Sequence, residues 1–129
     1  MLDTDIASYV IRGRPESARA RFRELESDQL CLSVVSEAEL LYGVRARGSL
    51  RALPAMLADF LRHLTILDRS RAAAAHYAEL RAKLEEQGTP IGNMDLMIAA
   101  HARSEEATLV TNNRKHFVRV PGLKIENWA

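Results

Sequence analysis

The chain has 129 residues, of which 47% are hydrophobic and 27% charged, as expected for a globular protein with one hydrophobic core. Its formal net charge of +1 excludes proteins that bind nucleic acid through bulk positive charge, so a polyanion would need a local basic patch. The lone cysteine, Cys31, and the lack of any apolar run long enough to span a membrane predict a cytoplasmic protein with one domain, residues 1–129.

Short apolar runs alternate with helical patterns along the chain. In chain order we predict a strand at 1–3, helices from 6 and at 15–25, a strand at 30–34, helices from 36 and at 50–64, a strand at 64–67, helices at 72–87 and 94–104, and strands at 108–111 and 123–126. This alternation is typical of an α/β fold with a mostly parallel sheet.

Polar side chains follow several of the predicted strands. Asp3 ends the first strand, Ser36 and Glu39 follow the second, and Asn112 and Asn113 follow the strand at 108–111. Ligands of such sheets bind outside the carboxyl ends of the strands. We therefore expect these side chains, which are distant in sequence, to line one edge of the sheet.

Carboxylates in apolar or strand-end settings are the best candidates for chemistry. They are Asp3, Asp5, Glu39 and Asp95. Hard divalent ions such as Mg²⁺ prefer oxygen ligands and often keep several waters. A bound ion would relieve the repulsion between such carboxylates, activate water and neutralise charge that develops on a phosphate.

Each carboxylate also has a structural explanation. Glu39 lies three residues after Ser36, as in a capping box. Asp95 falls in the first turn of its helix, where the helix dipole favours negative charge. Asp5 is expected to cap the first helix, and we rank this above metal binding. Asp3 is the hardest to explain structurally, because a carboxylate at the end of a buried strand is costly unless it is paired.

Other common active-site patterns are missing from the sequence. The four histidines show no His-x-x-x-His spacing, and there is no Gly-rich phosphate loop and no Gly-x-Ser-x-Gly turn. His101 lies among alanines in a predicted helix, which is typical of a packing residue. Metal-dependent chemistry on carboxylates therefore remains the leading interpretation.

Several motifs resemble those of PIN-domain proteins, in the same order along essentially the whole chain. They are Leu-Asp-Thr-Asp-Ile at 2–6, Glu-Leu-Leu-Tyr-Gly at 39–43, the block from Pro-Ile-Gly through Asp95 to Ala102 at 90–102, and Leu-Val-Thr-Asn-Asn at 109–113 followed by Phe117 and Val-Pro-Gly-Leu at 120–123. Within this family the chain is most similar to the VapC toxins of toxin–antitoxin systems.

The resemblance implies an α/β/α sandwich around a central, mostly parallel sheet of four to five strands. It also implies RNA cleavage that depends on Mg²⁺ or Mn²⁺, with tRNA as the expected target. Asp3 and Asp95 would be the main metal ligands, Glu39 would complete the catalytic acidic cluster, and Thr4 and Ser36 would support them. A homodimer and a VapB-type antitoxin that inserts a segment into the acidic cleft are implied as well.

The chain departs from the family pattern at three positions near these motifs. Asp5 replaces the usual Asn, which would add negative charge near the site. Asn113 stands where many relatives carry a fourth Asp, and His116 stands where related sequences often place a Glu. Either Asn112 or Asn113 could hold a metal-bound water. His116 could contact phosphate if protonated, although a structural role is favoured.

Two further functions compete with catalysis. The altered closing motif is compatible with a non-catalytic PIN-like module that binds RNA and has a degraded acidic site. A structural DNA-binding or nucleotide-binding α/β protein is the least supported, since a phosphate loop and a recognition-helix pattern are missing. In a ribonuclease, we expect basic side chains near the C-terminus to contact the RNA backbone, namely Arg114, Lys115, Arg119 and Lys124.

Overall fold

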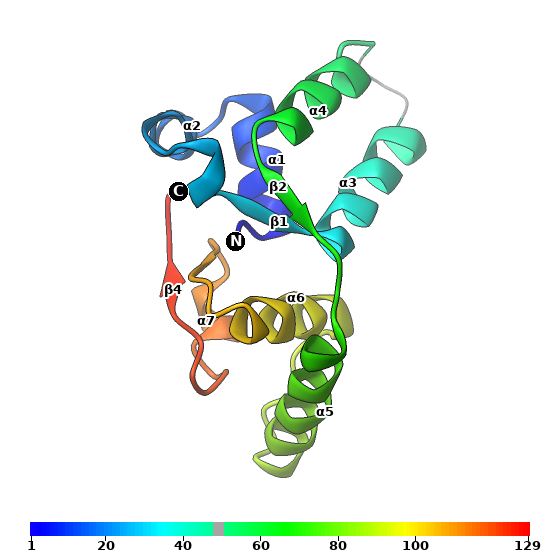
Figure 1. Ribbon diagram of the computed structural model, residues 1–129, viewed down its shortest axis with the longest axis vertical. Helices are drawn as coiled ribbons and strands as arrows, with labels where there is room; N and C mark the ends of the chain where they lie inside the picture. Colours follow the sequence, from blue (N-terminus) through cyan, green and yellow to red (C-terminus); the bar gives the residue numbers. More distant parts are fainter. Residues whose placement is uncertain (48–50) are drawn as a thin grey trace.

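The computed structural model describes residues 1–47 and 51–129, and Figure 1 shows how their helices and strands are arranged. The predicted helix start at Leu50 lies outside the described residues. The helices are α1 (Thr4–Arg12), α2 (Glu16–Glu24), a 3₁₀ turn η1 (Ser27–Gln29), α3 (Val34–Arg47), α4 (Leu53–Arg62), α5 (Arg71–Glu86), α6 (Asn93–Ser104) and α7 (Arg114–Phe117). The strands are β1 (Cys31–Ser33), β2 (Thr65–Leu67), β3 (Leu109–Val110) and β4 (Ile125–Glu126).

The strands form two parallel pairs, β1 with β2 and β3 with β4. Leu2 lies between the pairs, because it forms parallel bridges to both Leu32 and Val110. The amide of Leu2 donates to the carbonyl of Cys31 at 3.0 Å, and the amide of Asp3 donates to that of Val110 at 2.9 Å. The predicted α/β fold with parallel pairing is confirmed, although the strands are shorter than the apolar runs.

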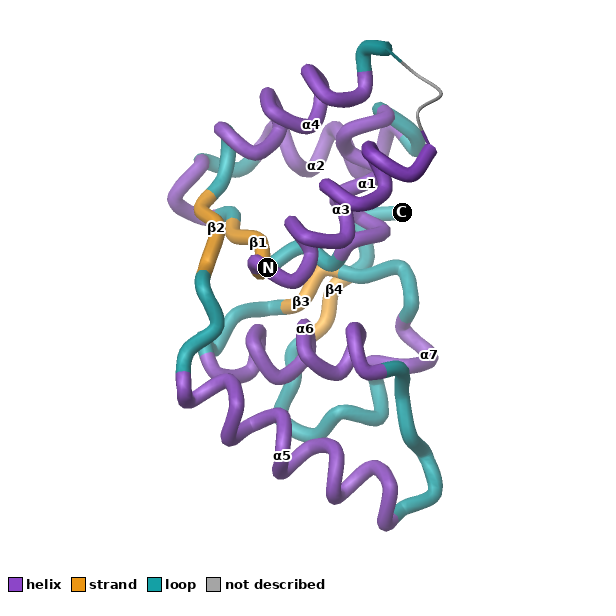
Figure 2. Tube along the Cα trace, turned by 90° about the vertical axis from the view of Figure 1, so that its right-hand side faces the viewer, coloured by secondary structure: helices purple, strands orange, loops and turns teal. Residues whose placement is uncertain are grey.

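Helices lie on both sides of the strands. In Figures 1 and 2, α1 to α4 lie on one side of the strands and α5 to α7 on the other. Each side has its own hydrophobic core. Leu2, Ile6, Leu32, Phe60 and Trp128 belong to the first core. The second core contains Leu80, Leu84, Leu96, Ile98 and Phe117. None of the described helices is both long and apolar enough to cross a membrane.

The first helix begins earlier than its sequence suggested. Asp3 is its N-cap, and the Asp3 carboxylate accepts a hydrogen bond from the Ile6 amide at 2.8 Å. The prediction that Asp5 caps this helix is therefore wrong. The first strand contributes Leu2 alone, so the chain turns into α1 directly after it and places Asp5 in the exposed first turn.

The helix after β1 also begins earlier than predicted. It starts at Val34 rather than near Ser36, because the Ser33 hydroxyl accepts from the Val35 amide at 3.1 Å directly after the strand. Ser36 is therefore fully buried inside the first turn of α3.

The N-caps of the second half of the chain were predicted with mixed success. The sequence offers Asp68 or Ser70 as the N-cap of the predicted helix at 72–87, and the structure shows Ser70 capping α5, with its side chain accepting from the Ala73 amide at 3.3 Å. The sequence also predicts Asn93 as the N-cap of the helix at 94–104, but Asn93 is the first residue of α6 and Gly92 takes the cap position.

His101 has the packing role expected for it. It is fully buried on α6, and its Nδ1 lies 2.8 Å from the Ser33 hydroxyl at the end of β1. Burial lowers the pKa of its imidazole. His101 therefore connects α6 to the strands from the side opposite α1.

Candidate active site

Asp3 is the most deeply buried carboxylate of the predicted cluster, with only 4% of its surface exposed. Burial raises its pKa from 3.8 to about 6, although hydrogen bonds from the Thr111 hydroxyl and the Ile6 amide act in the opposite direction. The charges of Asp5 and Asp95 raise it further. Burial thus makes the ionised form of Asp3 less favourable than that of an exposed aspartate, and a nearby positive charge would stabilise it.

Thr111 is a site residue that the sequence analysis missed. It follows β3, is fully buried, and donates a hydrogen bond to Asp3. Its hydroxyl oxygen accepts from the Asn113 amide at 2.9 Å, which leaves the hydroxyl proton free for the carboxylate. The only available signal was its place at the end of an apolar strand, directly before the two asparagines.

Glu39 faces Thr4 across the gap between α3 and α1. The Thr4 hydroxyl donates to Glu39 Oε1 at 2.7 Å and lies 3.2 Å from the buried hydroxyl of Ser36. Because Ser36 lies inside α3 and Glu39 bonds to another helix, the capping-box explanation for this pair is wrong. The contact instead holds the carboxylate of Glu39 next to the start of α1, where Asp3 lies.

Replacing Thr4 with valine tests this contact. We expect Thr4→Val to lower any RNA cleavage rate at least about tenfold, because a hydrogen bond to a charged group contributes roughly 1.5–3 kcal/mol. Thr4→Ser keeps the hydroxyl and should retain most of the activity. Single-turnover cleavage would measure both variants, with circular dichroism to check the fold. Equal rates for Thr4→Val and the unmodified chain would show that Glu39 does not need this bond.

Asp95 lies in the first turn of α6, beside the loop that follows β3. Its side chain is 37% exposed, and its Oδ2 is 3.4 Å from Nδ1 of His116. The Asn113 side-chain amide lies 2.8 Å from the same nitrogen. The two departures from the family pattern, Asn113 and His116, are thus neighbours of Asp95.

Asn112 points away from this group of side chains. Its amide contacts the Tyr9 hydroxyl at 3.5 Å, and its Oδ1 accepts from the Asn127 amide at 3.2 Å. Of the two predicted asparagines, the structure therefore places Asn113 and not Asn112 beside Asp95.

The carboxylate oxygens of Asp3 and Asp95 are suited to bind a hard divalent ion that keeps several of its water ligands. Within residues 1–47 and 51–129, no three His, Cys, Asp or Glu side chains lie close enough together to form a complete metal site. Mg²⁺, however, is usually bound through one or two carboxylates plus waters. Asp95 is close enough to Asp3 for its charge to raise the pKa of Asp3. Both carboxylates offer oxygen only, so the chemistry of the site fits Mg²⁺ or Mn²⁺.

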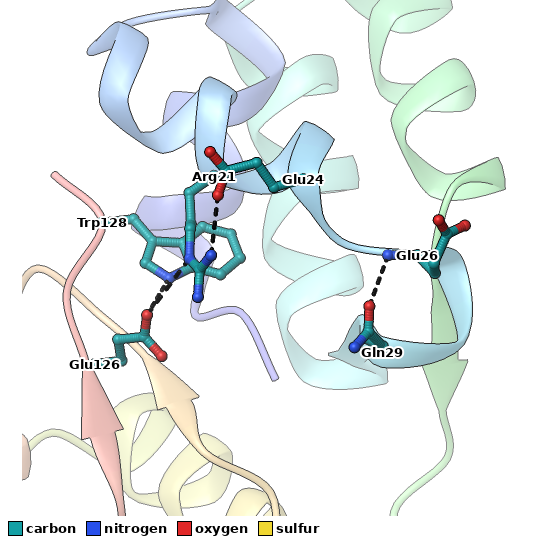
Figure 3. A network of polar contacts seen from close by, with 6 residues as sticks. All are labelled: Arg21, Glu24, Glu26, Gln29, Glu126 and Trp128. Carbon is teal, nitrogen blue, oxygen red and sulfur yellow. Dashed lines mark hydrogen bonds and ion pairs between the residues drawn. The ribbon is translucent and has the colours of Figure 1, made fainter.

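The basic side chains near the two ends of the chain differ in whether they are free to contact a polyanion. On α2, Arg21 pairs with Glu24 at 2.9 Å and with Glu126 at 3.7 Å, as Figure 3 shows. Trp128 donates to the same Glu126 carboxylate at 3.0 Å, so Arg21 helps to hold the C-terminal segment. On the other side, Arg114, Lys115, Arg119 and Lys124 are exposed. The side chains of α7 therefore present positive charge close to Asn113 and His116.

Comparison with known proteins places this geometry in a family. The PIN-domain model matches residues 1–123. The chain is 41% identical to the tRNA(fMet)-specific endonuclease VapC of Shigella flexneri and 44% identical to ribonuclease VapC2 of Haemophilus influenzae, each over 100% of this chain and 97% of the relative. The chain therefore belongs to the PIN-domain family, in its branch of VapC ribonucleases, which confirms the resemblance drawn from the motifs.

Solved structures of relatives share the whole fold. VapBC2 from Rickettsia felis, bound to a promoter DNA fragment, matches with a TM-score of 0.92 and 42% identity over 100% of this chain and 98% of that one. DNA-bound VapBC from Salmonella typhimurium matches with a TM-score of 0.92 and 39% identity, covering 100% and 97%. The arrangement of strands and helices described above is thus the fold of this branch.

Proposed function

We propose that this chain is a divalent-metal-dependent endoribonuclease that acts as the toxin of a VapBC-type pair. The observation that carries the proposal is the buried carboxylate of Asp3, whose raised pKa and interaction with Asp95 call for a cation. The expected cofactor is Mg²⁺ or Mn²⁺, held by Asp3 and Asp95. When bound, the ion would supply Lewis-acid stabilisation of the attacked phosphate.

The other side chains of the site activate water, position Asp3 and contact the substrate. Glu39, held by Thr4, orients the attacking water and accepts its proton. Thr111 and the Ile6 amide keep Asp3 ionised and fixed in direction. Asn113 and His116 lie beside Asp95, where they can position a water or a substrate oxygen. The exposed Arg114 and Lys115 are suited to contact neighbouring phosphates.

The relatives suggest the substrate and the partner. Two of them are named tRNA(fMet)-specific endonucleases, which supports tRNA as the RNA class that this chain cuts. Several solved relatives are VapBC complexes, which supports a VapB-type antitoxin as the inhibitor. We also propose a homodimer, a cytoplasmic location where tRNA is found, and one five-stranded sheet in which Leu2 joins the two pairs.

Cleavage of total RNA tests the proposal directly. The purified chain is incubated with total RNA and Mg²⁺ or Mn²⁺, with and without a chelator, and the new RNA ends are mapped by sequencing. We expect few, discrete cleavage sites that vanish with chelator and return when metal is added. An Asp3→Asn variant purified in parallel controls for contaminating ribonuclease. RNA that stays intact with either metal would contradict the proposal.

A non-catalytic RNA-binding module is the second candidate, favoured by Asn113 and His116 at positions where relatives carry acids. Calorimetric titration of Mg²⁺ and Mn²⁺ separates the two candidates, because a ribonuclease of this kind must bind metal. Absence of binding at millimolar metal, together with intact RNA binding, would favour the module.

A further inference from the structure

A groove opens beside the acidic cluster and leads away from it. It has a volume of about 420 Å³ and lies between α1, α3 and α4, which are neighbours in Figures 1 and 2. Thr4, Asp5 and Glu39 line one part of it, so the groove is continuous with the candidate active site. Leu40, Leu53 and Leu57 give it apolar walls.

Gly43 has no packing reason to be a glycine. It lies in the middle of α3 and lines the groove, and a Cβ added there would meet no atom of the described residues within 4 Å outside the backbone of its own helix. Glycine inside a helix is destabilising relative to alanine. Because no close backbone contact or positive φ explains this cost, the missing side chain points to space that is kept open for a ligand.

Tyr42 lines the same groove and is the most exposed large hydrophobic residue described, with 72% of its surface exposed. An exposed tyrosine ring beside an apolar slot is suited to stack on a nucleobase, as aromatic side chains do in proteins that bind single-stranded nucleic acid. Glu39, Tyr42 and Gly43 share one face of α3, since they are spaced by three and four residues.

The charges along the groove favour a base over a phosphate near the acidic cluster. Asp5, which is not a proposed metal ligand, would repel a phosphate in the groove but can accept hydrogen bonds from the amino groups of bases. Arg12 lines the groove at the other end of α1, roughly 10 Å along the helix axis from Asp5. Within the described ranges, 1–47 and 51–129, no carboxylate forms an ion pair with Arg12, so it is available to a phosphate.

We propose that this groove is a nucleoside subsite that holds one unpaired base next to the bond to be cut. Tyr42 stacks on the base, Gly43 keeps the groove open, and Arg12 contacts the phosphate that leads away from it. The proposal rests on the ribonuclease function proposed above. It predicts that the enzyme selects RNA in which the nucleotide next to the cleaved bond is unpaired and carries a base.

Binding measurements in a background that cannot cut RNA test the subsite. The Asp3→Asn chain is titrated with fluorescein-labelled single-stranded RNA to measure the dissociation constant. One RNA is intact. Each of two others carries one abasic nucleotide, on one side or the other of the mapped cleavage position. If no cleavage is found, a short adenosine oligomer with one central abasic nucleotide is used. We expect Tyr42→Ala to weaken binding of intact RNA about tenfold, and Tyr42→Phe to retain it. On RNA that lacks the base held in the groove, Tyr42→Ala should have no further effect.

Two further variants make the test specific. Gly43→Leu should fill the groove and weaken RNA binding, while thermal unfolding stays at or above that of the parent chain. Leu41→Ala is the matched control, because Leu41 is exposed on the same helix and does not line the groove. Equal losses on intact and abasic RNA, or unchanged RNA binding by Gly43→Leu with weakened binding of the antitoxin, would overturn the subsite. Since binding is read without cleavage, this result is independent of whether the chain is a nuclease.

Discussion

Replacing Asp3 with asparagine is expected to have two opposite effects, a loss of RNA cleavage by roughly 10²- to 10⁴-fold and a gain in stability. The loss follows because the variant removes the main buried negative charge of the proposed metal site. The gain follows because the Asp3 carboxyl has a pKa of about 6 in the folded chain and 3.8 as an isolated group. That difference corresponds to up to about 3 kcal/mol at neutral pH, which asparagine does not incur.

The pH dependence of the gain is a separate check. A carboxyl whose pKa is raised by folding binds its proton more tightly when folded, so it lowers the free energy of unfolding as the pH rises from about 4 to 6. Chemical denaturation in chelator should therefore show the stability advantage of Asp3→Asn growing over this interval and staying constant above it. Asparagine can still accept from the Ile6 amide, so the cap of α1 is retained. If Asp3→Asn were less stable than the parent chain at pH 7, the interpretation that the buried, ionised Asp3 destabilises the fold would be wrong.

Replacing Asp95 with asparagine should abolish cleavage to a similar degree without the gain in stability. Asp95 is partly exposed in the first turn of α6, so replacing it does not remove a buried charge as replacing Asp3 does. Removing its charge from the helix N-terminus should lower the free energy of unfolding by roughly 0.3–1 kcal/mol. Single-turnover cleavage and urea denaturation of the same preparation would measure both quantities.

Comparing the cleavage rate and the stability of Asp95→Asn distinguishes the two explanations left open for Asp95, a metal ligand or a charge that stabilises its helix. If Asp95→Asn cut RNA normally and only lost stability, its carboxylate would serve the helix dipole alone. Asp95→Glu is a useful companion variant, because it keeps the charge near the dipole but moves the oxygens by one methylene. We expect it to recover the stability and not the cleavage rate.

The positions of the acidic side chains could be predicted largely from one rule, that ligands of parallel sheets bind at the carboxyl ends of the strands. Asp3 and Glu39 could be predicted because each follows an apolar strand, and parallel strands present their carboxyl ends at one edge. The boundary between β1 and α3 could not be read from the sequence, since the apolar residues between Leu30 and Val35 lie on both sides of Ser33 and show no change of period. For that reason the partner of Glu39 was assigned to its own helix instead of to Thr4.

The choice between Asp3 and Asp5 as the N-cap depended on contacts far along the chain. Both residues are aspartates directly before helical positions, so local preference does not distinguish them. The hydrogen bond from the Asp3 amide to the Val110 carbonyl fixes where the strand ends. Thr111 escaped prediction for the same reason, because its role arises only when its strand lies beside Leu2.

The position of Leu2 between the two strand pairs also has a consequence for biosynthesis. Leu2 must pair with Val110, which leaves the ribosome more than one hundred residues after it. Such distant pairing is slow to form, because a long loop must close first. Asp3 therefore meets Thr111 only after the chain has been made through β3, so a nascent fragment that ends before β3 has Asp3 without the Thr111 hydrogen bond.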